Sequence, residues 1–253
     1  MLEGSELHSS LTQCLKELRL PTMRACYEEE AERARQESLS HEHYLAELVE
    51  REREVRRQNR IARFLRESKL PLEKNLDTFD LKRLPVKVSS QVKVLLEGSF
   101  LERTENVLAF GNPGSGKTHL LCAIGQELIH QGRRVLFASC NLLVQELLIA
   151  KQELRLPRVL KRLSKYNALI IDDIGYVQQS REEMEVLFHF LAERYERKSV
   201  VITSNLVFSQ WDQIFKDPMT TMAAVDRLVH HATILEFTGE SHRAQSAKAR
   251  NKG

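Results

Sequence analysis

The chain has 253 residues, a formal net charge of +3 and a sequence pI near 8.6. That length is enough for one large domain and a smaller one. No apolar run approaches the ~18 residues that span a bilayer, and the first residues include Glu3 and Glu6 instead of an apolar signal core. Without a CxxC pair, the four cysteines favour reduced thiols over a metal site or disulfides: Cys14, Cys26, Cys122 and Cys140. We therefore expect a cytoplasmic protein with no membrane contact.

The first 75 residues have helical periodicity and contain no glycine after Gly4. One apolar stripe recurs at helical spacing along the first expected helix: Leu7, Leu11, Leu15 and Leu18. A second helix is expected to start at Pro21, and Ser40 is the expected N-cap of a third. These patterns predict a small all-α N-terminal domain over residues 1–75, followed by a second domain over residues 76–253.

The third helix becomes rich in arginine toward its end: Arg51, Arg53, Arg56, Arg57, Arg60, Arg63 and Arg66. These side chains cannot all face one side of a helix, and glutamates lie on the neighbouring turns. Two interpretations remain open. The helix is either a solvated one with many ion pairs, or it presents a basic face to a phosphate backbone or an acidic partner.

The segment from Gly111 to Thr118 reads Gly, four residues, Gly-Lys-Thr, which is the P-loop pattern. The apolar run at 107–110 before it predicts a buried strand, and apolar residues at helical spacing after it predict a helix. Such a loop turns backbone N–H groups toward phosphates, and the helix N-terminus adds positive potential. Lys117 would reach the β and γ phosphates, and the Thr118 hydroxyl would ligate Mg²⁺. The residues expected to bind ATP are Gly111, Asn112, Pro113, Gly114, Ser115, Gly116, Lys117, Thr118 and His119.

Two further predicted strands end in polar residues. The run at 168–171 leads into Asp172 and Asp173, and the run at 199–203 leads to Asn205. Carboxyl ends of parallel strands meet at one edge of a sheet, so these side chains should lie beside the P-loop. Asp172 would hold Mg²⁺, Asp173 would polarise the attacking water, and Asn205 would orient that water or contact the γ-phosphate.

A basic stretch lies between the P-loop and the two aspartates, on a pair of helices predicted over residues 142–165. Few carboxylates lie beside it in the sequence, so a role in contacting a DNA backbone competes with that of a solvated face. The candidate DNA contacts are Lys151, Arg155, Arg158, Lys161, Arg162 and Lys165.

Taken together, these motifs resemble those of AAA+ ATPases, and more narrowly of the IstB/DnaC-like family. That family comprises the transposition helper ATPases of bacterial insertion sequences and the replicative helicase loaders. The resemblance covers nearly the whole chain, and its helical opening is more similar to the transposition helpers. The segments that carry it are LKELRLPTMR (15–24), GNPGSGKTHL (111–120), ALIIDDIG (168–175), TSN (203–205), DRL (226–228) and GESHR (239–243).

The resemblance implies an α/β fold with a five-stranded parallel sheet flanked by helices. It also implies that Arg227 is an arginine finger for ATP bound by a neighbouring subunit of a homo-oligomer, and that Arg243 is the sensor 2 arginine. Asp173 stands where a glutamate is commoner in the wider superfamily, which leaves the rate of hydrolysis open. The implied cofactors are ATP and Mg²⁺.

The function expected from these residues is that of an ATP-dependent helper of DNA transposition. It would assemble on duplex DNA with weak sequence preference, bend that DNA, present it to a transposase and hydrolyse ATP. The alternative is a loader whose partner is a replicative helicase. A small-molecule kinase is a third class, but the sequence offers neither an acceptor pocket nor a lid. The stoichiometry, the choice between ring and helical filament, and the DNA path stay open.

Overall fold

The computed structural model describes residues 4–174, 180–206, 210–211 and 225–238. The chain divides into two compact units, one up to Arg63 and one from Phe64 onward. The expected boundary at residue 75 falls inside the second unit, because the segment before it is hydrogen-bonded there. Gln126 Nε2 donates to the Lys74 carbonyl at 2.8 Å, and Arg134 pairs with Glu67 at 2.8 Å.

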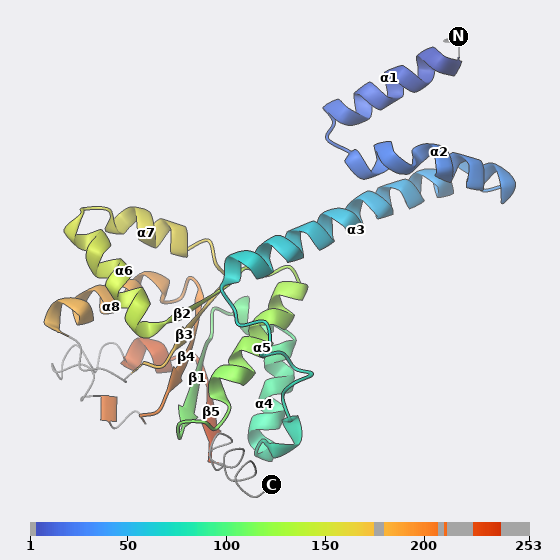
Figure 1. The fold of residues 1–253 in the computed structure, drawn as a ribbon. Helices are drawn as coiled ribbons and strands as arrows, with labels where there is room; N and C mark the ends of the chain where they lie inside the picture. Colours follow the sequence, from blue (N-terminus) through green and yellow to red (C-terminus); the bar gives the residue numbers. More distant parts are fainter. Residues whose placement is uncertain (1–3, 175–179, 207–209, 212–224, 239–253) are drawn as a thin grey trace, which may run out of the picture. The chain divides into compact units, whose positions relative to one another are not determined.

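The first unit consists of helices, as expected (Figure 1). These are α1 (Gly4–Glu17), α2 (Pro21–Gln36) and α3 (His41–Ser68), which continues past the end of the unit. The Ser40 hydroxyl accepts a hydrogen bond from the His43 N–H at 3.3 Å, which confirms the predicted N-cap. The core of this unit is small and consists of Leu15, Met23 and Leu48.

Of the apolar stripe predicted on the first helix, only Leu15 is buried. Leu7, Leu11 and Leu18 are 56%, 39% and 68% exposed, so a single position of the stripe contributes to the core of this unit.

The N-terminus of α2 is capped from a distant part of the chain. Leu20 at the N-cap position makes no side-chain cap, and Glu52 of α3 takes that role. Its Oε2 accepts from the N–H groups of Thr22 at 2.8 Å and Met23 at 3.0 Å, while Arg56 Nε donates to Oε1 at 2.7 Å. Burial raises the pKa of Glu52, but these hydrogen bonds outweigh it and hold the pKa below its ordinary value.

Four arginines in the middle of α3 form ion pairs with glutamates. The pairs are Arg51 with Glu30, Arg53 with Glu50, Arg56 with Glu52, and Arg57 with Glu54. For these four arginines, the structure favours ion pairing over a basic face.

The second unit contains a five-stranded sheet, in which the described strands are all parallel. Its order is β2-β3-β4-β1-β5, which confirms the predicted fold. The strands are β1 (Asn106–Gly111), β2 (Val135–Ser139), β3 (Ala168–Asp172), β4 (Ser199–Ser204) and β5 (Ala232–Phe237). The helices are α4 (Val86–Leu96), α5 (Lys117–His130), α6 (Cys140–Gln152), α7 (Leu156–Leu163) and α8 (Arg181–Arg194), with short 3₁₀ turns at Leu81–Arg83 and Ser99–Leu101.

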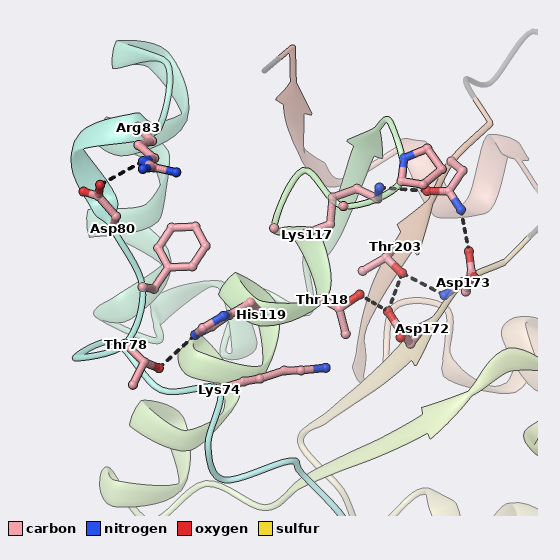
Figure 2. A pocket seen from close by; sticks show the side chains of 15 residues that line it. Lys74, Thr78, Asp80, Arg83, Lys117, Thr118, His119, Asp172, Asp173 and Thr203 are labelled. Carbon is pink, nitrogen blue, oxygen red and sulfur yellow. Dashed lines mark hydrogen bonds and ion pairs between the residues drawn. The ribbon is translucent and has the colours of Figure 1, made fainter. Parts of the chain in front are cut away.

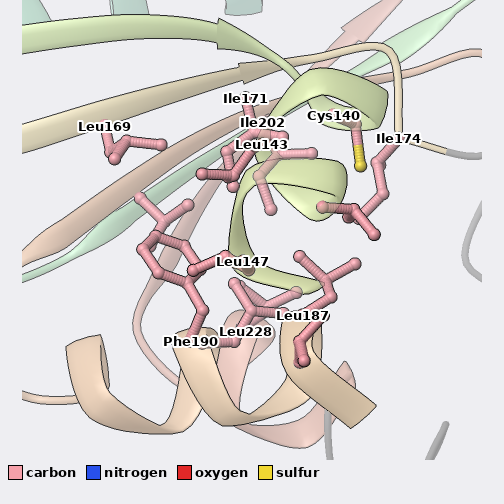
Figure 3. Close-up of a cluster of buried hydrophobic side chains, with 14 of the residues drawn as sticks. Cys140, Leu143, Leu147, Leu169, Ile171, Ile174, Leu187, Phe190, Ile202 and Leu228 are labelled. Carbon is pink, nitrogen blue, oxygen red and sulfur yellow. The ribbon is translucent and has the colours of Figure 1, made fainter. Parts of the chain in front are cut away.

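Helices cover both faces of the sheet, which explains the buried apolar runs of β1, β3 and β4 (Figure 1). On one face, Leu169 and Ile171 pack with residues of α6 and α8, such as Leu147 and Phe190 (Figure 3). On the other face α5 approaches closely, because a Cβ added at Gly125 would lie 2.9 Å from Ile170 Cδ1. Alternate residues of β3 thus serve two different cores.

The strand order brings the expected site residues to one edge of the sheet. In the parallel register Ile171 is paired with Ile202 and Phe110 with Ser204, so β3, β4 and β1 end side by side. Asp172, Asn205 and the P-loop follow at these ends. Within the described part of the chain, no helix combines the length and hydropathy that crossing a membrane requires.

Candidate nucleotide-binding site

The P-loop joins β1 to α5 through a turn that needs glycine. Gly116 is the N-cap of α5 with φ at 95°, and a Cβ there would lie 3.1 Å from the ring of Phe79. Gly111 has φ at 148°, and a Cβ there would lie 2.4 Å from the Phe237 carbonyl oxygen on β5. Both positions combine left-handed backbone with close packing, which only glycine accommodates.

A cavity of about 600 Å³ opens above this loop (Figure 2). A volume of several hundred Å³ is typical of small-molecule sites. Its lining comes from the P-loop, from the ends of β3 and β4, and from a segment before α4. The lining residues are Lys74, Thr78, Phe79, Asp80, Arg83, Pro113, Gly114, Gly116, Lys117, Thr118, His119, Asp172, Asp173, Thr203 and Asn205.

Lys117 points back into the loop. Its Nζ donates to the carbonyls of Gly111 at 2.6 Å and Asn112 at 2.9 Å, and to Asn205 Oδ1 at 2.8 Å. Burial lowers the pKa of this ammonium, and the nearby Asp173 and Asp172 partly oppose that effect. The lysine is therefore buried but surrounded by oxygen acceptors.

Asp172 accepts two hydroxyl groups on the same oxygen. Thr118 Oγ1 and Thr203 Oγ1 each donate to Asp172 Oδ1 at 2.7 Å. A hydroxyl and a carboxylate in contact are ligands of the kind that Mg²⁺ takes in phosphate sites. The structure thus brings together the two residues, Thr118 and Asp172, that the sequence assigns to the metal.

Asp173 is held in a left-handed conformation, with φ at 67°. Its N–H donates to Thr203 Oγ1 at 2.7 Å, and its Oδ1 accepts from Asn205 Nδ2 at 2.8 Å. Burial and the charge of Asp172 raise the pKa of Asp173, against the opposing effect of Lys117. Lys117, Asn205 and Asp173 therefore form one continuous hydrogen-bonded chain across the site (Figure 2).

Thr203 connects the two aspartates, although the sequence pattern assigns it no role. Its hydroxyl donates to Asp172 and accepts from the backbone N–H of Asp173. The residue is only 2% exposed. It appeared only as part of the TSN motif. Its position on β4 beside the acidic strand is the signal that could have singled it out.

The segment from Lys74 to Arg83 is the second missed part of the site. Thr78 Oγ1 lies 3.1 Å from His119 Nε2, and the Phe79 ring is edge-on to His119 with centroids 5.2 Å apart. Asp80 accepts from the Lys82 N–H and so caps the 3₁₀ turn that follows. Its apolar residues follow no regular period, so the sequence pattern predicts no regular element there.

One unpartnered hydroxyl in the loop also fits a phosphate ligand. Ser115 Oγ is buried and has no hydrogen-bond partner among the described residues. Buried polar atoms are generally satisfied, so this hydroxyl, beside the cavity lining, fits an absent oxygen-rich ligand. The residues present fit both a nucleotide and its magnesium ion.

The remaining predicted catalytic arginines do not line this cavity as described. The Arg227 guanidinium lies 4.9 Å from the centroid of the Phe188 ring. Its Nη1 is buried and has no hydrogen-bond partner in the described part of the chain. Arg243 lies outside the described residues.

The candidate DNA contacts divide into two groups. Lys151 pairs with Glu185 at 2.9 Å, Arg155 with Glu153, and Arg162 with Glu146. The expectation of few nearby carboxylates is therefore wrong, because Glu146 lies one helix back and Glu185 reaches over from α8. Arg158, Lys161 and Lys165 are exposed and have no carboxylate partner among the described residues.

Sequence comparison identifies the family. Residues 13–250 match the family model described as "IstB-like ATP binding protein". The chain belongs to this family. It is 44% identical over 234 residues to an insertion-sequence ATP-binding protein of Sinorhizobium fredii, covering 92% of this chain and 78% of that one. It is 39% identical over 217 residues to the insertion sequence IS21 ATP-binding protein of Pseudomonas aeruginosa, covering 86% and 82%.

Structural comparison places this IstB-like chain among AAA+ folds. The DnaC helicase loader matches with a TM-score of 0.56 at 19% identity, over 66% of this chain and 97% of that one. AMPPCP-bound DnaA from Aquifex aeolicus matches with a TM-score of 0.58 at 19% identity, over 73% and 56%. At these identities the likeness shows the fold alone.

Proposed function

We propose that this IstB-like protein hydrolyses ATP in the cavity above the P-loop, and that nucleotide binding controls its assembly on duplex DNA during transposition. The hydrogen-bonded chain of Lys117, Asn205 and Asp173, with Asp172 beside it, carries the proposal. At one edge of the sheet, these residues provide a cation that can bind phosphate, a ligand for magnesium and a carboxylate that can activate water.

Each residue of the site has a distinct task. Gly111 to Thr118 would hold the phosphates through backbone N–H groups and the Lys117 ammonium. Mg²⁺, held by Thr118 and Asp172, would neutralise charge on the phosphate oxygens. Asp173 would accept the proton of the attacking water, and Asn205, now bonded to both Lys117 and Asp173, would orient that water.

The segment before α4 supports ATP as the ligand. Phe79 and His119 present aromatic surface beside the phosphate-binding loop, and Thr78 and Asp80 supply polar atoms. An aromatic wall with a few polar groups fits a purine base. We assign the base to this segment.

The position of Arg227 supports an active form that consists of several copies of the chain. It does not line its own cavity as described, and its Nη1 has no partner there. A guanidinium that stabilises a transferring phosphoryl group must lie within contact distance of it. Arg227 would serve the ATP of a neighbouring copy, so each complete site would lie between two subunits.

Three exposed cations on or just after α7 would contact DNA: Arg158, Lys161 and Lys165. Contacts of this kind go to phosphates, so binding should depend strongly on salt and weakly on sequence. Relatives at 36–44% identity are described as insertion-sequence ATP-binding proteins, which favours a transposase over a replicative helicase as the partner.

Fluorescence anisotropy on a random-sequence duplex tests the proposal. With a non-hydrolysable ATP analogue and Mg²⁺ at low salt, the protein should bind duplex more tightly than without nucleotide. Lys117→Ala should abolish that difference. Nucleotide-independent binding would refute the proposed control by ATP, and a clear preference for single strands would favour the helicase loader.

A further inference from the structure

A second cluster of ligand-bearing side chains lies at the end of the sheet opposite the nucleotide cavity. Ligand atoms of Glu196, His230 and His231 lie within 4.8 Å of one another, and all three residues are exposed. Glu196 belongs to the tight turn between α8 and β4, while the two histidines directly precede β5. Two separate segments therefore converge here.

The backbone that carries these side chains is fixed by buried Asn106 at the start of β1. Its N–H donates to the His231 carbonyl at 2.7 Å, and its Nδ2 donates to the Leu228 carbonyl at 3.2 Å. Its Oδ1 accepts from the Val200 N–H at 2.9 Å. One side chain thus ties the segment before β5 to the beginning of β4.

The turn that carries Glu196 is fixed by a second buried group. Arg194 is 3% exposed, and its guanidinium donates to the carbonyls of Ser199 at 2.8 Å, Leu163 at 3.1 Å and Tyr166 at 3.2 Å. The supports of all three potential ligands are therefore rigid, which favours a site with defined geometry.

A neighbouring hydroxyl orients one of the imidazoles. Tyr195 Oη lies 3.0 Å from His230 Nδ1, and the rings of His230 and His231 have centroids 4.0 Å apart. When Nδ1 donates to the tyrosine oxygen, the lone pair of Nε2 is left free for a ligand. Histidines that bind metals usually have such a partner on the other ring nitrogen.

We propose that Glu196, His230 and His231 form a site for a divalent transition metal of the zinc class, with water completing the coordination. Two imidazole nitrogens and one carboxylate oxygen suit Zn²⁺, whereas Mg²⁺ prefers oxygen ligands throughout. Zn–N bonds are ~2.0 Å long, and the exposed side chains can rotate to place their ligand atoms at that distance from one ion. The metal would join the α8–β4 turn to the helical residues 225–229, which carry Arg227.

Zinc binding to the untagged full-length chain tests this site. After treatment with a chelator and without nucleotide, Zn²⁺ is titrated in competition with a chromogenic chelator. We expect one Zn²⁺ per chain with micromolar or tighter affinity. His230→Ala and His231→Ala should each weaken it at least ~10-fold, and Tyr195→Phe, which keeps all three ligands, should also weaken it, by about 10-fold.

Two histidines elsewhere serve as matched controls. His130 lies 3.7 Å from Glu127 on the surface of α5, and His242 lies in the tail beyond the described residues. Replacing either with alanine should leave zinc affinity unchanged. The proposal is overturned if binding is weaker than ~100 μM, or if it survives His230→Ala in a chain whose circular dichroism is normal.

Discussion

A single hydroxyl organises both acidic groups of the candidate ATPase site. Thr203 Oγ1 donates to Asp172 and accepts from the Asp173 N–H, both at 2.7 Å. Asp173 has φ at 67°, in the left-handed region that is uncommon for non-glycine residues. We infer that Thr203 keeps the carboxylate of Asp173 aimed at the cavity.

Replacing Thr203 with valine should therefore impair turnover more than nucleotide binding. Valine keeps the shape but leaves the buried Asp173 N–H without its acceptor and Asp172 without one donor. We expect kcat to fall about 100-fold, a loss of the size seen when a positioned polar group is removed from an active site. Steady-state ATP hydrolysis and the affinity for a fluorescent ATP analogue measure the two effects.

Thr203→Ser is the matched control, because it keeps the hydroxyl and loses only a methyl group. It should retain kcat to within a few-fold. If valine and serine variants turn over ATP equally, the hydroxyl does not position the aspartates.

At the scale of elements, the sequence predicted where the strands lie better than it predicted contacts between distant segments. The apolar runs located β1, β3 and β4, because each is buried on both faces and bounded by polar residues. Motif spacing then placed Asp172 and Asn205 beside the P-loop. Phe79 escaped prediction because its contact with His119 joins segments that have no shared periodicity.

The charge balance of α6 and α7 escaped prediction for a related reason. Glu185 neutralises Lys151 from a helix that lies far along the chain, and Glu146 meets Arg162 only when α6 and α7 pack together. Counting charges along a sequence does not include such pairs. We therefore propose Arg158, Lys161 and Lys165, which have no carboxylate partner among the described residues, as the first DNA contacts to test.

Removing the unpaired cations should weaken DNA binding more than removing the cations that form ion pairs. Changing Arg158, Lys161 and Lys165 together to alanine should weaken duplex binding strongly. It should also reduce the slope of log affinity against log salt by about 2 to 3, the release expected for that many phosphate contacts. Anisotropy over a salt series measures both quantities.

The control is the triple alanine variant of Lys151, Arg155 and Arg162, which removes the same formal charge. Its cations are already paired within the chain, so its salt slope should change less. Equal slopes for the two triple variants would show that the ion pairs do not protect those residues from DNA.

The cap on α2 predicts a pH-dependent contribution to stability. Since the pKa of Glu52 is below its ordinary value of 4.5, its carboxylate stabilises the fold above that pH. The contribution disappears as the pH falls through the lower folded-state pKa. Glu52→Gln should cost about 1 kcal/mol at neutral pH, in the range of a lost N-cap.

Melting temperatures of the wild type and of Glu52→Gln, measured across pH, test whether the stabilisation by Glu52 is lost at low pH. Their difference should be largest above pH 4.5 and shrink below it. Glu50→Gln is the control, because Glu50 is exposed and its ion pair, with Arg53, lies within α3. If Glu52→Gln still melts at a lower temperature than the wild type at the lowest pH, the lost stability comes from packing and not from charge.

At the scale of the whole molecule, the position of Arg227 predicts complementation between defective copies. Lys117→Ala and Arg227→Ala should each hydrolyse ATP poorly, for different reasons. Mixed in equal amounts with DNA, they should regain activity, because about a quarter of random head-to-tail interfaces then pair an intact loop with an intact arginine. Activity of the mixture no greater than the sum of its parts would place Arg227 outside the neighbour's site.

The three oxygen acceptors around the Lys117 ammonium also affect which ligands the site can bind. The Lys117 ammonium has three acceptors within the protein, at 2.6, 2.9 and 2.8 Å. An incoming anion must displace those contacts, so only the difference between old and new partners contributes to affinity. A triphosphate with several oxygens can outcompete these acceptors, whereas a single inorganic phosphate gains little. We therefore expect the site to bind ATP far more tightly than inorganic phosphate, which a competition titration with a fluorescent ATP analogue would measure.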